Sequence, residues 1–143
     1  MISVSSVLRV KNFRMVRSSS FSHAEYADAS IVRADSEVIF LAGACPLDEK
    51  GVVVAPGDIA AQTRKALENM DAVLARCQVS LEDVAFLRVL VATDQPESLG
   101  VAWTVVREHF GSHDVPATLH GVSVLGYRDQ LVEIEPIAAR SPR

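Results

Sequence analysis

The stretch LVEIEPIA, from Leu131 to Ala138, predicts a strand with two different faces. Side chains alternate along a strand, so Glu133 and Glu135 share one face, about 7 Å apart along the chain. Val132 and Ile134 point the other way, as core residues of a sheet do. Two carboxylates on one side of so apolar a strand are the first candidates for a functional site.

The sequence before this strand predicts two helices and several further strands. From Asp58 to Gln78, small or apolar side chains recur in steps of three and four, which is typical of an amphipathic helix. Asp58 is a good N-cap for it. Pro96 to Phe110 predicts a second helix, which Gly111 ends. The predicted strands are Ala29–Ala34, Glu37–Ala42, a short arm at Gly51–Ala55, Val84–Thr93, Ala117–Leu125 and Leu131–Ala139.

The order of these elements predicts an α+β fold, with one sheet and two helices packed on one of its faces. The strands are apolar on both sides. We therefore expect the other face of the sheet to be buried against further subunits of a homo-oligomer.

Length and composition predict a single folded domain. The chain has 143 residues, of which 49% are hydrophobic and 22% charged, enough for a substantial core. Residues 1–25 differ, with a serine cluster and little periodicity. We interpret them as a poorly ordered lead-in, with one short strand near Val7–Val10. The domain proper is then predicted to span residues 26–143.

Charge and cysteine content exclude several classes of function. A net charge of −4 and a pI near 5.5 argue against a nucleic-acid binder and against binding to anionic membranes. Two cysteines without a CxxC pattern indicate neither a disulfide framework nor a zinc site. His109 and His113 are not expected to form a metal pair, because Gly111 interrupts the helix between them. With no signal peptide and no apolar run of about 18 residues, the predicted location is the cytoplasm.

Five segments in this order and spacing resemble the Rid family, also known as RidA/YjgF and by the older label endoribonuclease L-PSP. They are FLAGACPLDEKGVV, GDIAAQTRKALENMDAVL, SLEDVAFLRVLV, VVREHFG and LVEIEPIA. The resemblance covers about Tyr26 to Ala139. The helix motif D-I-x-x-Q-x-x-x-A-L-E-N and the closing V-E-I-E are specific when they occur together.

The resemblance implies a chorismate-mutase-like fold assembled as a homotrimer. The sheets of the three subunits would form an inner barrel, with three clefts between subunits. Members of the family with the type activity, reactive intermediate deaminases, hydrolyse enamines and imines to a ketone and ammonia. They use no cofactor and no metal.

The resemblance also implies the residues of the site. Glu133 corresponds to the glutamate that orients the attacking water, and Tyr26 to a tyrosine near the start of the domain. The backbone of Gly43 and Ala44 would line the cleft, with Cys45 beside it in the same loop. His120 takes the place of a small residue that faces the pocket.

One position departs from the family pattern. The family's P-A-R motif, whose arginine grips a substrate carboxylate, reads Pro116-Ala117-Thr118 in this chain. Thr118 can donate one neutral hydrogen bond, whereas each charge-assisted bond of an arginine contributes about 1.5–3 kcal/mol. We therefore expect little activity on simple 2-imino acids and a preference for a less charged or larger substrate.

Alternatives stay open for the individual residues. Glu133 would serve as the group that binds and deprotonates water if it is partly buried, whereas Glu135 fits better as a solvent-facing residue or an ion-pair partner across the subunit boundary. His120 is either an acid or base near neutral pH or a histidine bonded to a neighbouring strand. Cys45 is expected to be an inert thiol. Trp103 is expected to lie in the helix core.

Two functions of different kinds follow. The first is a metal-free imine or enamine hydrolase, or a tautomerase, acting on a reactive small molecule. The second is a trimer of the same fold that binds a small metabolite or a protein partner without chemistry. Nuclease activity, the older label, is disfavoured by the acidic charge and by the lack of a metal or general-base pair for phosphodiester cleavage.

Overall fold

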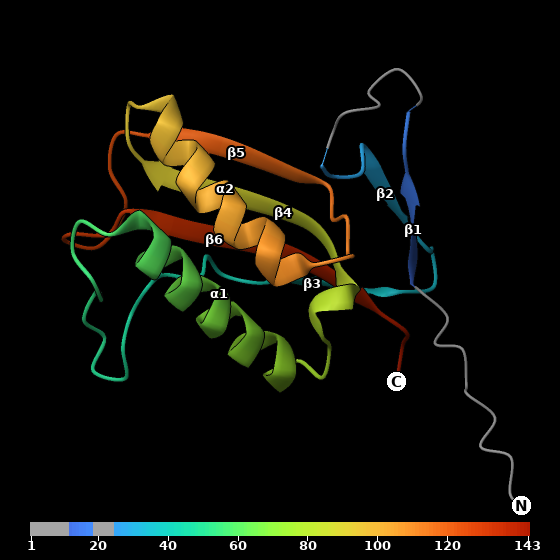
Figure 1. Cartoon of the computed structure of the whole chain (residues 1–143). Coiled ribbons are helices and arrows are strands. Elements are labelled where there is room, and N and C mark those ends of the chain that lie inside the picture. Colours follow the sequence, from blue (N-terminus) through green and yellow to red (C-terminus); the bar gives the residue numbers. More distant parts are fainter. Residues whose placement is uncertain (1–11, 19–24) are drawn as a thin grey trace, which may run out of the picture.

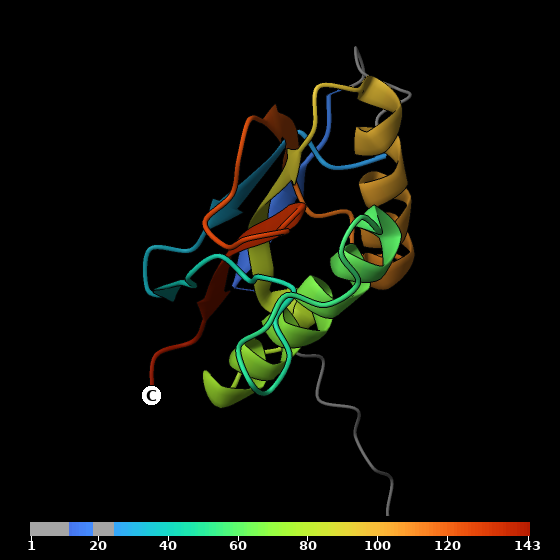
Figure 2. The ribbon, with the colours of Figure 1, turned by 90° about the vertical axis from the view of Figure 1, so that its left-hand side faces the viewer.

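Two helices cover one face of a four-stranded mixed sheet in the computed structural model, which describes residues 12–18 and 25–143 (Figure 1). The helices are α1 (Ile59–Arg76) and α2 (Pro96–Phe110). The strands of this sheet are β3 (Glu37–Phe40), β4 (Val84–Ala92), β5 (Ala117–Val122) and β6 (Val132–Arg140). Their order is β3-β6-β4-β5, with β6 antiparallel to both neighbours and β4 parallel to β5. The predicted α+β class is confirmed, as is the placement of both helices on one face (Figure 2).

Local signals in the sequence fix the ends of the helices. The side chain of Asp58 accepts a hydrogen bond from the backbone N–H of Ala61 at 2.9 Å and so begins α1. Pro96 opens α2, where its missing N–H costs nothing. Gly111, at φ +57°, ends α2 in a left-handed conformation that favours glycine. A short 3₁₀ turn, η2 (Leu81–Asp83), leads into β4 and carries a capping box on Ser80.

The core lies between the helices and the sheet. Alternate residues of β4 (Leu87, Val89 and Val91) and of β6 (Val132 and Ile134) are buried there. They pack against Ala66, Leu67, Met70 and Leu74 of α1 and Ala102, Val106 and Phe110 of α2. Since side chains alternate along a strand, the odd-numbered residues of β6 face away from the helices, as do the even-numbered residues of β4 from Phe86 on, after the β-bulge that follows Val84.

No helix of the described chain covers that second face, which we call the helix-free face. Phe40 of β3, 76% exposed, lies in register with Ile137 of β6 on this face. Phe86 of β4 is the next partner in the same row. An apolar row of this kind is unusual on the surface of a monomer. The trimer and the barrel that were expected to cover it stay predictions.

A second, two-stranded sheet departs from the predicted topology. The strand expected at Ala29–Ala34 is β2 (Ala29–Val32), and it pairs with β1 (Phe13–Val16) rather than joining the main sheet. The physical reason is a small separate core, in which Phe13 packs with Ala85 of β4 and Ala139 of β6. The single sheet predicted from the sequence was therefore wrong at this point.

The predicted N-terminal lead-in is described only in part. Residues 12–18 include strand β1, which the sequence analysis did not anticipate there. The strand expected near Val7–Val10 lies outside the described residues, as does most of the lead-in. Two other elements are shorter than expected. The arm at Gly51–Ala55 consists of a single bridge between Leu47 and Val53, and β5 ends at Val122.

Candidate functional site

Three of the seven residues predicted for the site, Glu133, His120 and Thr118, lie in two neighbouring rows on the helix-free face. In the first row, Glu133 of β6 pairs with Leu90 of β4, which pairs with His120 of β5. In the second row, Glu135 of β6 pairs with Arg88 of β4, which pairs with Thr118 of β5. Glu133 and Glu135 therefore share one face, as the sequence predicted.

The carboxylate of Glu133 lies against the segment that follows β3. The backbone of Ala44 exchanges two hydrogen bonds with Ile134, at 2.7 and 3.1 Å, and so carries the edge of the sheet past the end of β3. The thiol of Cys45 donates a hydrogen bond to Oε1 of Glu133 at 3.2 Å. A Cβ atom built on Gly43 would lie 2.6 Å from both the carboxyl carbon and Oε1 of Glu133. Only a glycine leaves room for the carboxylate in this position.

The helix motif of the sequence holds the loops around this carboxylate in place. Gln62 is fully buried and donates to the carbonyls of Ala55 and Asp129, at 3.2 and 2.9 Å, while its Oε1 accepts from the N–H of Leu131 at 2.7 Å. It thereby fixes the segment that enters β6 two residues before Glu133. The motif was visible in the sequence, but these contacts over long sequence distances were not.

Asn69 fixes the loop that follows β3 in the same way. Its side-chain nitrogen donates to the carbonyls of Cys45 and Leu47, at 2.8 and 2.9 Å. Since α1 lies against β6 through the core, the two amide side chains of one helix set the two loops that meet at Glu133.

The thiol of Cys45 is held in its neutral form. Burial, followed by the hydrogen bond and the negative charge of Glu133, raises the pKa of Cys45 to about 11. A thiol with so high a pKa is a poor nucleophile at neutral pH, because the thiolate is the reactive form. The structure thus agrees with the expectation of an inert Cys45.

Glu135 forms an ion pair within the chain. Its Oε2 accepts a hydrogen bond from Nη1 of Arg88 at 2.9 Å, and the guanidinium carbon lies 5.8 Å from the centre of the Phe86 ring. Glu135 was expected to face solvent or to pair with a charge across the subunit boundary, whereas its partner in the structure is Arg88 of the same chain. Arg88 was not considered a site residue, although it lies beside Thr118 in the sheet.

Thr118, His120 and Tyr26 line a cavity of about 430 Å³ at the outer edge of β5. Its remaining walls are Ala117, Leu119 and the ring of Trp103. Tyr26 and Trp103 meet edge to face, with ring centroids 5.8 Å apart, and the indole nitrogen of Trp103 donates to Glu25 at 2.7 Å. Placing Trp103 in the helix core was therefore only half right, because one side of its ring faces this cavity. The only sequence signal was its spacing, which fits either position.

The predicted residues consequently fall into two groups within one chain. Gly43, Ala44 and Cys45 line a cavity of about 270 Å³ that reaches to Tyr127 and α1, and Glu133 contacts this group through Cys45. Tyr26, Thr118 and His120 form the other group. Two strand spacings, about 10 Å, separate the backbones of Glu133 and His120, with Leu90 between them.

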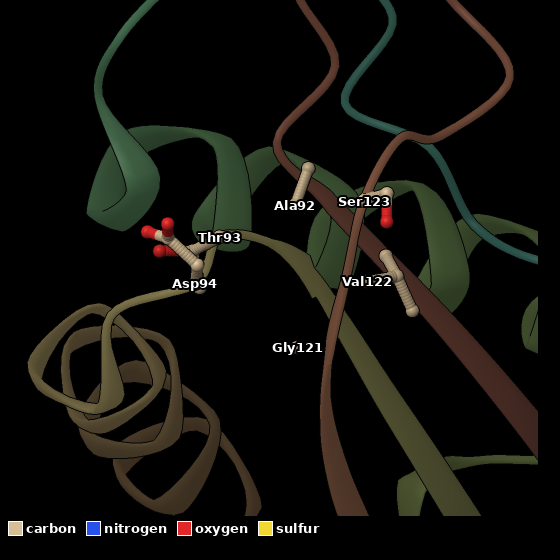
Figure 3. Close-up of a pocket in the computed structure, with 6 residues that line it drawn as sticks. All are labelled: Ala92, Thr93, Asp94, Gly121, Val122 and Ser123. Carbon is tan, nitrogen blue, oxygen red and sulfur yellow. The ribbon is translucent and has the colours of Figure 1, made fainter.

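A third cavity, of about 530 Å³, opens where the parallel strands β4 and β5 end (Figure 3). Thr93 and Asp94 line it just before α2 begins, and Val122 and Ser123 line it at the end of β5. Strands and loop approach closely here, since a Cβ atom on Gly121 would lie 2.8 Å from the carbonyl oxygen of Thr93. None of the residues predicted for the site lines this cavity.

His109 and His113 have local partners. His109 lies 2.9 Å from Asp71 between the two helices, and the ring of His113 is 2.8 Å from the carbonyl of Val84. Among the described residues, no three His, Cys, Asp or Glu side chains gather closely enough to hold a metal ion. Within the same residues, neither helix combines the length and the apolar character that crossing a membrane requires.

Comparison with known proteins places this geometry in a family. The sequence profile described as Endoribonuclease L-PSP matches residues 18–140. A RutC family protein of Pyrococcus horikoshii is 37% identical over 100 residues, which are 70% of this chain and 77% of that protein. The 3-aminoacrylate deaminase RutC of Acinetobacter baylyi is 41% identical over 59 residues, 41% of this chain and 46% of that protein.

Solved structures of family members have the same fold. The Rid family protein YyfB of Yersinia pestis superposes with a TM-score of 0.80 at 23% identity, over 90% of this chain and 99% of that one, which shows a shared fold. A Mycobacterium tuberculosis member of the YjgF/YER057c/UK114 family superposes with a TM-score of 0.60 at 26% identity, over 88% and 98% of the two chains. The chain therefore belongs to the YjgF/RidA/L-PSP family, as its motifs suggested.

Proposed function

We propose that the protein hydrolyses an imine or enamine whose carbon skeleton carries no free carboxylate. The observation that carries the proposal is the arrangement of Glu133, whose carboxylate is held beside Gly43 by the thiol of Cys45 on the helix-free face. The name of the Acinetobacter relative, a 3-aminoacrylate deaminase, supports deamination as the reaction. Since 3-aminoacrylate itself carries a carboxylate, the choice of an uncarboxylated substrate rests on Thr118.

The proposed chemistry needs one carboxylate and one water. Glu133 accepts a proton from water as the water oxygen bonds to the imine carbon, and the C=N π electrons become a lone pair on nitrogen. Nitrogen takes up the proton, giving a carbinolamine. A second proton transfer lets the C–N bond break, so that ammonia leaves and a carbonyl forms. The reaction consumes one water for each ammonia released.

His120 is the second group in the proposed mechanism. Within one chain the backbones of Glu133 and His120 are about 10 Å apart across β4. In this proposal the His120 side chain that reaches the substrate hydrogen-bonds it or supplies a proton to its nitrogen.

The charges near Thr118 favour an uncharged substrate. Arg88, its neighbour in the sheet, is already bound to Glu135. The cavity that Thr118 lines has Tyr26, Trp103, Ala117 and Leu119 as further walls, with no lysine or arginine among the described lining residues. Such walls accept an apolar or aromatic group.

We also propose that the active form is a homotrimer, with the helix-free faces turned towards one another. The exposed Phe40 row supports burial of this face. The division of the site residues into two groups supports a cleft completed by a second subunit, in which Tyr26 and His120 of one chain meet Glu133 of the next.

The test uses two imines made in situ, one by an amino-acid oxidase and one by an amine oxidase, so that only the first carries a carboxylate. Semicarbazide traps whatever imine is not hydrolysed, and ammonia release is followed in parallel. Wild-type protein is compared with Glu133→Gln, Thr118→Arg and Glu135→Gln. The last variant frees Arg88 without adding a cation.

We expect wild-type protein to accelerate hydrolysis of the uncarboxylated imine and Glu133→Gln to lower that rate at least tenfold, as loss of an acid–base group does. Thr118→Arg and Glu135→Gln should both gain activity on the carboxylated imine. Unchanged turnover in Glu133→Gln would remove the role proposed for that carboxylate.

A second candidate function is binding without chemistry, and the replacement of the arginine by Thr118 is the observation that favours it. In that case neither imine is hydrolysed by any variant. A metabolite would instead raise the melting temperature without forming product.

A further inference from the structure

We propose that Cys45 is a positioning residue for Glu133, whose thiol hydrogen bond and neighbouring Gly43 hold the carboxylate in the single orientation that presents Oε2 to water. The inference deepens the function proposed above and rests on it for its kinetic consequence. The contact itself can be tested without any substrate.

The first step of the argument is that the carboxylate has one hydrogen-bond partner in the described part of the chain. The thiol of Cys45 lies 3.2 Å from Oε1, and no described group bonds to Oε2. A carboxylate on a strand rotates about its side-chain torsions unless something fixes it. The hydrogen bond distinguishes the two oxygens, occupying Oε1 and leaving Oε2 to meet a water.

The second step is steric. The space next to the carboxylate is the space that a side chain on residue 43 would take, with contacts of 2.6 Å to the carboxyl carbon and Oε1. Gly43 therefore allows the carboxylate to lie flat against the backbone, and Cys45 two residues later holds it there. The carbonyl of Gly43, 3.6 Å from the same sulfur, is a second acceptor for the thiol.

The third step is the rigidity of the thiol. Asn69 of α1 binds the carbonyls on both sides of Pro46, at Cys45 and Leu47. The backbone of Ala44 is tied to Ile134 by two hydrogen bonds. The donor is thus anchored to the helix and to the strand that carries Glu133, as a positioning residue must be.

The fourth step is that the thiol stays protonated. Burial, together with the hydrogen bond to Glu133 and its charge, raises the pKa of Cys45 to about 11, so at neutral pH the sulfur has a proton to donate. Serine in its place would donate a hydrogen bond of the same kind, whereas alanine could not. The pair of variants separates the hydrogen bond from the mere filling of space.

The contact is tested by alkylation of Cys45 with iodoacetamide in a Cys77→Ser background, followed by mass spectrometry across pH 7 to 11. If the contact exists, adding Glu133→Gln removes the negative charge beside the thiol. We then expect the apparent pKa of Cys45 to fall from about 11 towards its ordinary value of 9.0, and alkylation to quicken several-fold near pH 9. A profile that Glu133→Gln leaves unchanged would overturn the proposal, whether or not a substrate is turned over.

The kinetic test compares Cys45→Ala, Cys45→Ser and, as the matched control at the other thiol, Cys77→Ala. We expect Cys45→Ala to lower kcat on the uncarboxylated imine between about tenfold and a hundredfold with little change in KM, since misplacing a catalytic group by about 1 Å has effects of this size. Cys45→Ser should restore most of kcat, and Cys77→Ala should leave it as in wild type.

The possible failures are distinguishable. If wild-type protein is active but Cys45→Ala keeps the wild-type kcat, the positioning role is wrong and the proposed function stands. If wild-type protein hydrolyses neither imine, the proposed function fails. The alkylation profile then still decides whether Cys45 holds Glu133.

Discussion

Gly43 is the residue at which the backbone and the carboxylate of Glu133 come closest. Its φ is not among the positive values of the described chain, so alanine would suit the backbone there. The obstacle to alanine is the side chain of Glu133, because the Cβ of alanine would overlap its carboxyl group. Position 43 therefore reports on the placement of Glu133 rather than on backbone strain.

Gly43→Ala is expected to displace Glu133 and to lower turnover of the uncarboxylated imine at least about tenfold while the fold persists. The control is Gly100→Ala, where a Cβ atom meets nothing within 4 Å. That change should leave turnover alone and stabilise α2 by about 0.5–1 kcal/mol. Steady-state kinetics and circular dichroism check both. Equal turnover in the two variants would contradict the described approach of Gly43 to Glu133.

Cys45 predicts a pH dependence of stability. Its pKa is raised in the folded state to about 11 from 9.0, so the folded chain keeps a proton that the unfolded chain loses first. The stabilisation from the neutral thiol is complete below pH 9 and is lost as the pH rises from 9 to 11. Urea unfolding at several pH values should show a steeper loss for wild type than for Cys45→Ser, whose hydroxyl does not ionise there. Parallel curves would contradict the raised pKa.

Helix α1 connects the core to the site, since the helix that buries Leu67 and Met70 also carries Gln62 and Asn69. The side chain of Gln62 hydrogen-bonds backbone groups near the start of β6 and in the loop before α1. A buried amide of this kind has no substitute partner if it is removed, so the backbone groups it serves become unsatisfied.

Gln62→Ala is expected to lower the free energy of unfolding by about 2–4 kcal/mol, through lost packing and unpaired backbone groups. Arg64→Ala, on the exposed side of the same helix, should change it by less than about 0.5 kcal/mol. Denaturant unfolding measures both. A small effect of Gln62→Ala would mean that water replaces its hydrogen bonds.

The elements also differ in how well the sequence predicted them. Both helices were predicted closely because their caps, Asp58, Pro96 and Gly111, act within a few residues. The pairing of β2 with β1 was missed, because β1 has only four residues and its partner is set by the burial of Phe13 against residues far along the chain. Pattern reasoning has no access to such contacts.

The same distinction holds for the site. Glu133 and Glu135 could be placed on one face from their spacing alone, and the resemblance supplied Gly43 and Thr118. The hydrogen bond from Cys45 to Glu133 spans 88 residues, and no local sequence pattern predicts it. Arg88 was visible as the one charge in an apolar strand, yet its pairing with Glu135 follows only from the register of the sheet.

In the described part of the molecule helices cover one face of the main sheet and not the other, and this asymmetry predicts assembly. Both helices lie on the covered side (Figure 2). On the other side Phe40 is mostly exposed and Val38 on the same strand is 45% exposed. A domain of this size does not usually leave such residues in water.

Phe40→Lys is expected to shift the protein from an oligomer to a monomer at micromolar concentration, because a charge would be buried between subunits. Val101→Lys on α2 is the control, since Val101 is an exposed apolar residue like Phe40 but lies on the helix side, and it should leave the mass unchanged. Sedimentation velocity measures both. Wild-type protein sedimenting as a monomer would remove the proposed trimer.

The position of β6 in the sheet has a consequence for biosynthesis. β6 is the last strand along the chain but lies between β3 and β4, and it supplies Val132, Ile134 and Ala138 to the core. While the ribosome is still translating the preceding residues, α1 and α2 have no complete sheet to cover. The apolar sides of both helices therefore stay accessible to chaperones until residues 132–140 leave the exit tunnel and β6 completes the sheet.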